Sequence, residues 1–138
     1  MSEENVDVVR RALAHYEQTD EVLTELYASD SVCDMSNYPG WPEQAIYKGI
    51  AGLRRFLGDW GRVFDWEYEV ESIHDAGEYV VFVVCMQARG KETGLEFTWP
   101  AGHLWTVRDG KITRLAIYAD AAEALRHAGL PEDALPSV

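Results

Sequence analysis

The pair Asp109-Gly110, set between two segments of alternating apolar residues, constrains the fold of this chain more than any other feature. The segments 95–107 and 112–118 predict strands, and the four residues between them predict a tight turn. Aspartate and glycine tolerate the positive φ angles that both central residues of a type I′ turn require. We therefore expect an antiparallel hairpin in the last third of the chain.

A short helix is expected directly after this hairpin. Asp120 and Glu123 have the spacing of a capping box, in which side-chain oxygens accept hydrogen bonds from free backbone N–H groups at a helix start. The sequence Gly129-Leu130-Pro131 indicates where that helix ends, because glycine is favoured just past a helix and proline cannot continue one. The last strand therefore leads into a capped helix.

The rest of the chain predicts helices first and strands later. In order, we expect a helix over 3–18, a shorter helix from about residue 20, a strand over 29–36, a loop over 37–45, a helix over 50–64, and strands starting near residues 66 and 79. Helices gathered on one face of an antiparallel sheet form an α+β fold. We expect a cone in which a curved sheet carries the helices on its concave face and leaves a cavity between the two layers.

The segment 79–86 is almost wholly apolar, so the sequence predicts a strand that is covered on both faces. The helices would cover one face, and a partner subunit could cover the other.

Length and charge limit the possible functions. The 138 residues are enough for one domain, 1–138, with a core of its own. The 24 acidic residues outnumber the 12 basic ones, and the formal charge of −12 opposes binding to nucleic acid or to an anionic membrane. The sequence shows no signal peptide and no apolar run of about 20 residues, so we expect a cytoplasmic protein without a membrane partner.

The sequence favours chemistry without a cofactor or a metal. It contains no glycine-rich phosphate loop, no His-Glu-x-x-His motif, no Cys-x-x-Cys motif and no Gly-x-Ser-x-Gly motif. No cluster of histidine and acidic residues has the spacing of metal ligands. Cys33 and Cys85 are expected to be reduced core residues.

Two side chains are candidates for acid–base chemistry. Asp34 follows Val32 and Cys33 and precedes Met35, and apolar surroundings raise the pKa of a carboxyl group, which suits a general base. Alternatively, Asp34 points to solvent or pairs with an arginine. His103 lies within a predicted strand, where an imidazole in a cavity can carry protons. The alternative for His103 is a hydrogen-bonded residue of the core or of an interface.

Aromatic side chains predict the walls of a binding cavity. Tyr16 and Tyr118 could donate hydrogen bonds to a ligand, and Trp60 offers a flat apolar surface, although tryptophan is also ordinary core filling. Trp41 lies in a Pro-Gly-Trp-Pro loop, outside any helical or strand pattern, so we expect it to cover the mouth of the cavity. These residues favour a small apolar or aromatic molecule as the ligand.

Several short sequences resemble the nuclear transport factor 2-like superfamily and, within it, the SnoaL-like polyketide cyclases. They are Tyr-Ala-Ser-Asp-Ser-Val at 27–32, Tyr-Lys-Gly at 47–49 followed by Gly52, Trp-Thr-Val-Arg-Asp-Gly-Lys-Ile at 105–112, and the ending 120–130. The resemblance covers essentially the whole chain. It implies a deep apolar cavity and, often, a homodimer formed through the outer face of the sheet. Because the superfamily holds many activities, the resemblance specifies the fold and leaves the reaction open.

The resemblance also implies roles for single residues. Alignment with the ketosteroid isomerase branch places Gly102 and Ala12 where that branch has its oxyanion-binding aspartic acid and its catalytic tyrosine. Only Asp34, or Met35 in the alternative register, falls at the third catalytic position, so steroid isomerisation by those residues is rejected. Polyketide cyclases of the SnoaL type use a carboxylate near the end of the last strand, and Asp120 is its nearest match. Helix capping alone is the alternative for Asp120.

Three functions fit these observations. The first is a cofactor-free cyclase, isomerase or hydratase that acts on an apolar or aromatic, polyketide-like substrate through Asp34, His103 and Asp120. The second is a non-catalytic, dimeric ligand-binding module with the same cavity. The third is an interaction domain whose interior is filled by its own aromatic side chains.

Overall fold

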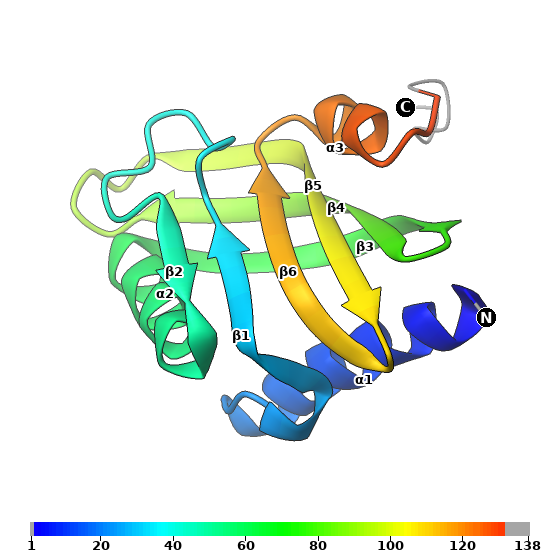
Figure 1. The fold of residues 1–138 in the computed structure, drawn as a ribbon. Coiled ribbons are helices and arrows are strands. Elements are labelled where there is room, and N and C mark those ends of the chain that lie inside the picture. Colours follow the sequence, from blue (N-terminus) through cyan, green and yellow to red (C-terminus); the bar gives the residue numbers. More distant parts are fainter. Residues whose placement is uncertain (1, 132–138) are drawn as a thin grey trace.

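The computed structural model describes residues 2–131, with side chains from residue 4 onward. The elements follow the chain in this order: α1 (Ser2–Thr19), the 3₁₀ turn η1 (Thr24–Leu26), β1 (Tyr27–Asp34), β2 (Ile46–Lys48), α2 (Gly49–Val63), β3 (Phe64–Ala76), β4 (Tyr79–Gly90), β5 (Glu96–Arg108), β6 (Lys111–Tyr118) and α3 (Ala121–His127). Figure 1 shows a strongly curved sheet with α1 below it, α2 at the left beside β2, and α3 above it. The predicted α+β cone is confirmed.

The described strands form one six-stranded sheet in the order β2-β1-β6-β5-β4-β3. Neighbouring strands run antiparallel, as predicted, except that β1 runs parallel to β6. These two strands are far apart in the sequence, and the long crossover between them contains α2 and the four strands β2, β3, β4 and β5, so a parallel pairing is possible. One parallel pair therefore lies inside an otherwise antiparallel sheet.

The predicted hairpin joins β5 and β6. Asp109 and Gly110 have φ angles of 52° and 75°, as a type I′ turn requires, and Arg108 pairs with Lys111 across the turn. The predicted cap of α3 is also present, because the carboxylate of Asp120 accepts a hydrogen bond of 2.9 Å from the backbone N–H of Ala122. The last third of the chain therefore folds as its turn and cap residues indicate.

Two elements differ from the sequence predictions. The helix expected from about residue 20 is a single 3₁₀ turn, and β1 begins directly after it at Tyr27. The loop expected over 37–45 is followed by the short strand β2, which pairs with the end of β1, Asp34 opposite Ile46. A strand of three residues is too short to show an alternating pattern in the sequence, so β2 gave no signal.

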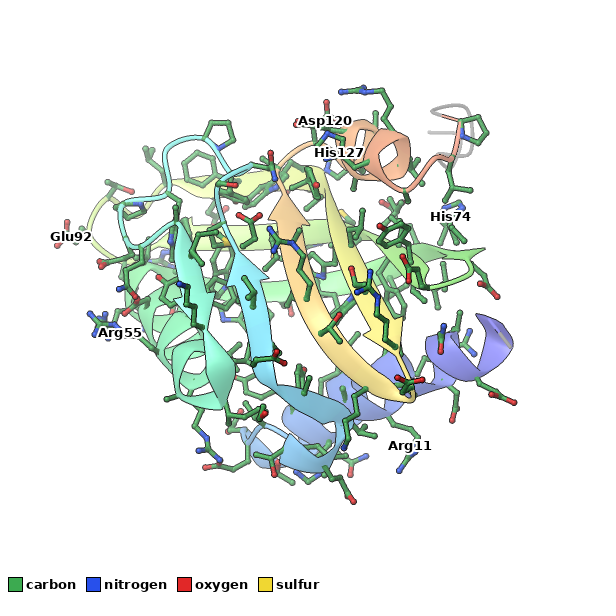
Figure 2. The ribbon with its side chains drawn as sticks, in the orientation of Figure 1. Arg11, Arg55, His74, Glu92, Asp120 and His127 are labelled. Carbon is green, nitrogen blue, oxygen red and sulfur yellow. The ribbon has the colours of Figure 1, made fainter. Side chains whose placement is uncertain are left out.

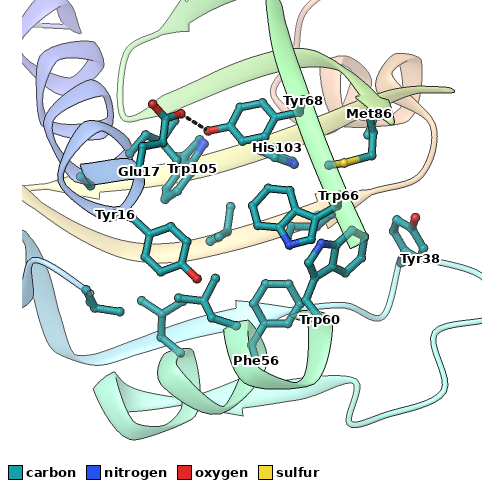
Figure 3. Close-up of a pocket in the computed structure, with 18 of the residues that line it drawn as sticks. Tyr16, Glu17, Tyr38, Phe56, Trp60, Trp66, Tyr68, Met86, His103 and Trp105 are labelled. Atoms are coloured by element: carbon teal, nitrogen blue, oxygen red, sulfur yellow. Dashed lines mark hydrogen bonds between the residues drawn. The ribbon is translucent and has the colours of Figure 1, made fainter. Parts of the chain in front are cut away.

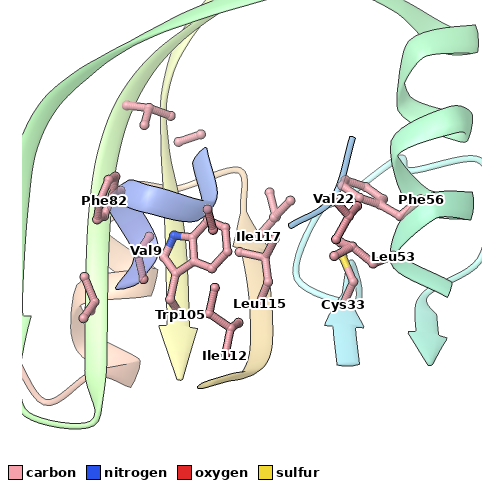
Figure 4. Packing of buried hydrophobic residues seen from close by; sticks show 14 of the residues in the cluster. Val9, Val22, Cys33, Leu53, Phe56, Phe82, Trp105, Ile112, Leu115 and Ile117 are labelled. Atoms are coloured by element: carbon pink, nitrogen blue, oxygen red, sulfur yellow. The ribbon is translucent and has the colours of Figure 1, made fainter. Parts of the chain in front are cut away.

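The core has two parts, one on each face of the sheet. Along β4, Val80, Phe82 and Val84 face the layer of α1 and α2, whereas Val81 and Val83 face α3. Figure 4 shows part of the larger cluster, which extends from α1 across the inner face to α2. The strand is covered on both faces, as predicted, and α3 of the same chain covers Val81 and Val83 on the outer face.

α3 packs so closely on β5 that the contact leaves no room for a side chain at Gly102. A Cβ atom there would lie 2.5 Å from the Cβ atom of Ala124 and 3.1 Å from the Cα atom of Ala121. Because part of this contact is backbone, the helix itself would have to move. Overpacking of this kind costs about 1–3 kcal/mol.

We therefore expect the Gly102→Ala substitution to lower the free energy of unfolding by about 1–3 kcal/mol, measured by urea denaturation. Gly61→Ala in α2 is the matched control, because nothing lies within 4 Å of a Cβ atom at that position. Alanine favours a helix over glycine by up to about 1 kcal/mol, so the control should be neutral or stabilising. Equal destabilisation by both substitutions would contradict the close packing of α3.

Within residues 2–131, none of the helices combines the length and the apolar character needed to cross a bilayer.

Candidate functional site

A cavity of about 100 Å³ lies between α1, α2 and the inner face of the sheet. β5 forms its floor, because alternate residues of a strand point to the same face and Trp99, Ala101, His103 and Trp105 all line the cavity. α1 contributes Tyr16 as part of a wall. Figure 3 shows Tyr16, His103 and Trp105 around a common space. The cavity is therefore built from elements at both ends of the chain.

Aromatic rings form most of its remaining wall. Trp60 of α2 lies at the centre of this group, with its ring centroid 4.7 Å from that of Phe64, 5.9 Å from that of Tyr38 and 6.3 Å from that of Trp66. Trp66 in turn stacks on Tyr68, with centroids 5.8 Å apart and ring planes only 9° from parallel. Such a wall offers flat apolar faces to a ligand.

One end of the cavity carries polar groups. The hydroxyl of Tyr68 on β3 donates a hydrogen bond of 3.0 Å to the carboxylate of Glu17 on α1. The rings of Tyr68 and His103 lie edge to face, with centroids 6.2 Å apart. Burial raises the pKa of Tyr68, and its hydrogen bond to Glu17 raises it further, so this phenol stays protonated at neutral pH. Figure 3 shows Glu17, Tyr68, His103 and Trp105 together at this end.

His103 is the buried ionisable group of the site. It is 8% exposed, and burial lowers its pKa to about 4, because a charged imidazolium is poorly solvated in apolar surroundings. At neutral pH the imidazole is therefore uncharged. The backbone of His103 pairs with Phe82 of β4 and Ile117 of β6 in the sheet.

The structure places Tyr16, Trp60 and His103 around the cavity, which brings together three of the residues that the sequence singled out. Burial raises the pKa of Tyr16, so its phenol is also protonated at neutral pH. In the sequence, Tyr16 continues an apolar stripe with Val9 and Leu13, and Trp60 continues one with Leu53 and Leu57; this helical spacing indicates that both rings face inward.

Asp34 does not line the cavity, so its predicted position is wrong. Cys33 and Met35 belong to the inner core, and Asp34 points to the other face, where it pairs with Arg114 of β6. Burial by itself raises the pKa of Asp34, but hydrogen bonds of 2.6 and 2.8 Å from Ser36 and the nearby charge of Arg114 outweigh it, and the pKa is lowered. The arginine pairing named as the alternative is the one present.

Asp120 and Tyr118 also lie outside the cavity. Figure 2 shows Asp120 at the start of α3 and His127 at the same end of the molecule, on the outer side of the sheet. Asp120 is exposed and caps the helix, whereas Tyr118 packs in the outer core, where its hydroxyl lies 2.6 Å from Nδ1 of His127. Of the three predicted acid–base residues, only His103 faces the cavity.

Trp41 does not line the cavity; it packs against two aromatic residues of the cavity wall. Its ring stacks on Trp60, with centroids 5.5 Å apart, and lies 5.9 Å from the ring of Phe56. Its indole N–H donates to the backbone oxygen of Gln44, which ties the loop to itself. Tyr38 of the same loop reaches the cavity instead.

Sequence reasoning missed the pair formed by Glu17 and Tyr68. The alternation of apolar and acidic residues in β3 signalled that Tyr68 faces inward, but nothing in the sequence indicated a partner 51 positions away. Glu17 lies near the exposed end of α1, where a carboxylate normally faces solvent. Within the part of the chain that the structure describes, no three histidine, cysteine or acidic side chains are grouped so that they could hold a metal ion.

Comparison with known proteins identifies a domain family and solved structures that share this fold. The family model described as the SnoaL-like domain matches residues 9–115. A nuclear transport factor 2-like protein from Burkholderia xenovorans LB400 is 27% identical, covers 93% of this chain and 97% of its own, and superposes with a TM-score of 0.77. No curated protein matches the chain.

Two further solved structures share the fold at lower identity. TerC, co-crystallised with polyporic acid, is 20% identical over 91% of this chain and 98% of its own, with a TM-score of 0.72. A proposed SnoaL-like polyketide cyclase from Mesorhizobium loti is 22% identical over 82% of this chain and 97% of its own, with a TM-score of 0.66. At this level of identity, the likeness shows the fold alone.

Proposed function

The chain belongs to the SnoaL-like domain family, as its resemblance predicted, and we propose that it binds a small, neutral, one-ring aromatic molecule in the cavity between α1, α2 and the sheet. The observation that carries this proposal is a buried space walled by aromatic rings and containing one uncharged imidazole. Cavities with apolar walls bind apolar molecules. That TerC was co-crystallised with polyporic acid supports ligand binding by this fold.

The volume of the cavity argues for one ring. A cavity of about 150 Å³ in another protein accepts benzene, and this one measures about 100 Å³. A polycyclic molecule would require the aromatic side chains to move apart. Burying about 200 Å² of a ring at about 25 cal/mol per Å² yields about 5 kcal/mol, so we expect a Kd of about 0.1–1 mM for a plain ring.

Charge argues for a neutral ligand. Among the described residues that line the cavity, Glu17 is the one with a formal charge at neutral pH, since His103 is uncharged. An anionic ligand would be repelled by this carboxylate and would find no cation to pair with. The net charge of −12 adds to this repulsion.

Titration with toluene, followed by tryptophan fluorescence, tests the proposal. Ala101 lines the cavity and is 1% exposed, so Ala101→Met should fill the space and abolish binding. Ala122→Met in α3, outside the cavity, is the matched control and should bind like the unsubstituted protein. Absence of binding to the unsubstituted protein, or equal binding by Ala101→Met, would overturn the proposal.

Cofactor-free acid–base catalysis is the second candidate function. It is favoured by one observation, a buried imidazole beside the Tyr68–Glu17 hydrogen bond, but a base with a pKa of about 4 is weak at neutral pH. Cyclisation, isomerisation and hydration of polyketide-like compounds should be assayed with His103→Gln, and with Asp34→Asn as the variant outside the cavity. Turnover that is lost only in His103→Gln would support catalysis, and turnover equal in both variants would remove His103 from it.

The homodimer through the outer sheet face stays a prediction. α3 covers the outer face of β4 and β5 near Val83 and Gly102, so a partner would have to contact the parts of that face that α3 leaves uncovered. Size-exclusion chromatography with light scattering separates the mass of one chain from that of two.

A further inference from the structure

Two buried donors of the cavity have no acceptor. The indole Nε1–H groups of Trp99 and Trp105 are inaccessible to solvent, and neither has a hydrogen-bond partner among the described residues. An unsatisfied buried donor costs about 1–3 kcal/mol, so native proteins contain few of them. Both tryptophans line the cavity, which suggests that an acceptor arrives with the ligand.

Of the two donors, Trp105 is the one that lies near the other polar groups of the cavity. One small ligand can therefore contact Trp105 and those groups together. It is two residues from His103 on the same face of β5, about 7 Å along the strand. Trp99 is six residues away from Trp105, about 20 Å along the strand, which exceeds the length of one ring. Figure 3 shows the indole nitrogen of Trp105 directed toward the end of the cavity where Glu17 and Tyr68 meet.

At this end of the cavity, one unpaired donor lies among several hydrogen-bond acceptors. The indole of Trp105 can only donate, whereas the carboxylate of Glu17, the hydroxyl oxygen of Tyr68 and the unprotonated ring nitrogen of His103 can accept. A ligand group that satisfies both kinds must accept one hydrogen bond and donate another. A methyl group does neither, and a carboxylate cannot donate and is repelled by Glu17.

We propose that the ligand of this cavity carries a neutral hydroxyl group on its ring, as in a phenol, whose oxygen accepts from Nε1–H of Trp105 and whose O–H donates to an acceptor at the same end. This inference rests on the proposed function and specifies its ligand class. A site built around a hydroxyl discriminates against an analogue that lacks it, because the buried donor is then left unpaired. Trp105 would thus determine the specificity of binding.

Phenol and toluene are the probes, because they differ only by a hydroxyl in place of a methyl group. Their Kd values are measured by calorimetry for the unsubstituted protein, for Trp105→Phe and for Trp66→Phe. We expect the ratio of the toluene Kd to the phenol Kd to fall about 5–10-fold in Trp105→Phe, the effect of one hydrogen bond. Trp66→Phe also replaces an indole of the cavity wall by a smaller ring. The N–H group of Trp66 is not one of the unpaired buried donors, so the ratio of the toluene Kd to the phenol Kd should stay unchanged in this variant.

A second measurement uses only the unsubstituted protein, so it does not depend on whether a variant folds. In a ¹H–¹⁵N spectrum of the unsubstituted protein, the indole N–H resonance of Trp105 should move downfield with phenol and not with toluene. Benzoate should not bind. If both rings bind and the Kd ratio is the same in Trp105→Phe, the hydroxyl inference is wrong while the proposed function stands. If neither ring binds, the proposed function itself fails.

Discussion

Trp60→Ala should destabilise the protein by about 3–5 kcal/mol, the loss typical of a buried tryptophan replaced by alanine. Trp60 is 5% exposed and contacts Tyr38 and Trp41 of the loop, Phe64 and Trp66 of β3, and Phe56 of its own helix. Domains of this size are stable by about 5–15 kcal/mol, so the substitution should remove a large share of that stability. The measurement is the free energy of unfolding from urea denaturation.

Trp60→Phe is the matched control for this prediction. It retains a ring in the same place and should cost clearly less than the alanine variant, because much of the cavity left by alanine stays filled. A loss below about 1 kcal/mol in Trp60→Ala would show that the ring contacts around α2 contribute little, and the assignment of Trp60 as the centre of the aromatic wall would fail.

Acidification should destabilise the protein through His103. In the unfolded chain the imidazole binds its proton near pH 6.5, whereas in the folded chain burial lowers its pKa to about 4. Between these values the unfolded state holds more protons, so stability falls as the pH falls from about 7 to 4. The pKa difference corresponds to about 3 kcal/mol.

The contribution of His103 is isolated by comparison with His103→Gln, which cannot titrate. Asp34 also has a lowered pKa, so its carboxylate contributes stability that is lost on acidification, but this loss is common to both proteins and cancels in the difference. We expect the unsubstituted protein to lose about 3 kcal/mol more than the variant between about pH 7 and pH 4. Parallel pH profiles for the two proteins would mean that the imidazole of His103 is hydrated in the folded state.

Local signals in the sequence were enough for much of the fold. The Asp109-Gly110 turn and the Asp120 cap each depend on residues within a few positions of one another, and both are present. The spacing of apolar residues in α1 and α2 indicates that Tyr16 and Trp60 face inward. This pattern repeats along each helix, so it holds even if the end of the helix is misplaced by one residue. Local geometry determines these features, so the sequence alone predicts them.

The direction of Asp34 depends on information that is not local. Its strand pairs parallel with β6, and the register of that pairing shifts between Tyr27 and Val32. A shift of one residue exchanges the two faces of a strand, so alternation read from either end of β1 gives different answers. The partner that fixes Asp34, Arg114, is 80 positions away. Contacts of this range arise only when the sheet is assembled.

The same reason explains the polar end of the cavity. Glu17 and Tyr68 come from a helix and a strand that contact each other only in the folded chain, and the unpaired N–H of Trp105 becomes visible only when every nearby acceptor is placed. Composition predicted an aromatic cavity, but the arrangement of donors and acceptors within it required the structure.

Bromobenzene soaked into crystals of the protein tests most directly whether this cavity is the ligand site, because the anomalous signal of bromine locates the ring without prior assumptions. We expect one strong peak inside the cavity, among Trp60, Trp66 and Trp105. A cavity without a peak, or a peak only on the outer face of the sheet near Tyr118, would contradict the assignment of this cavity as the functional site.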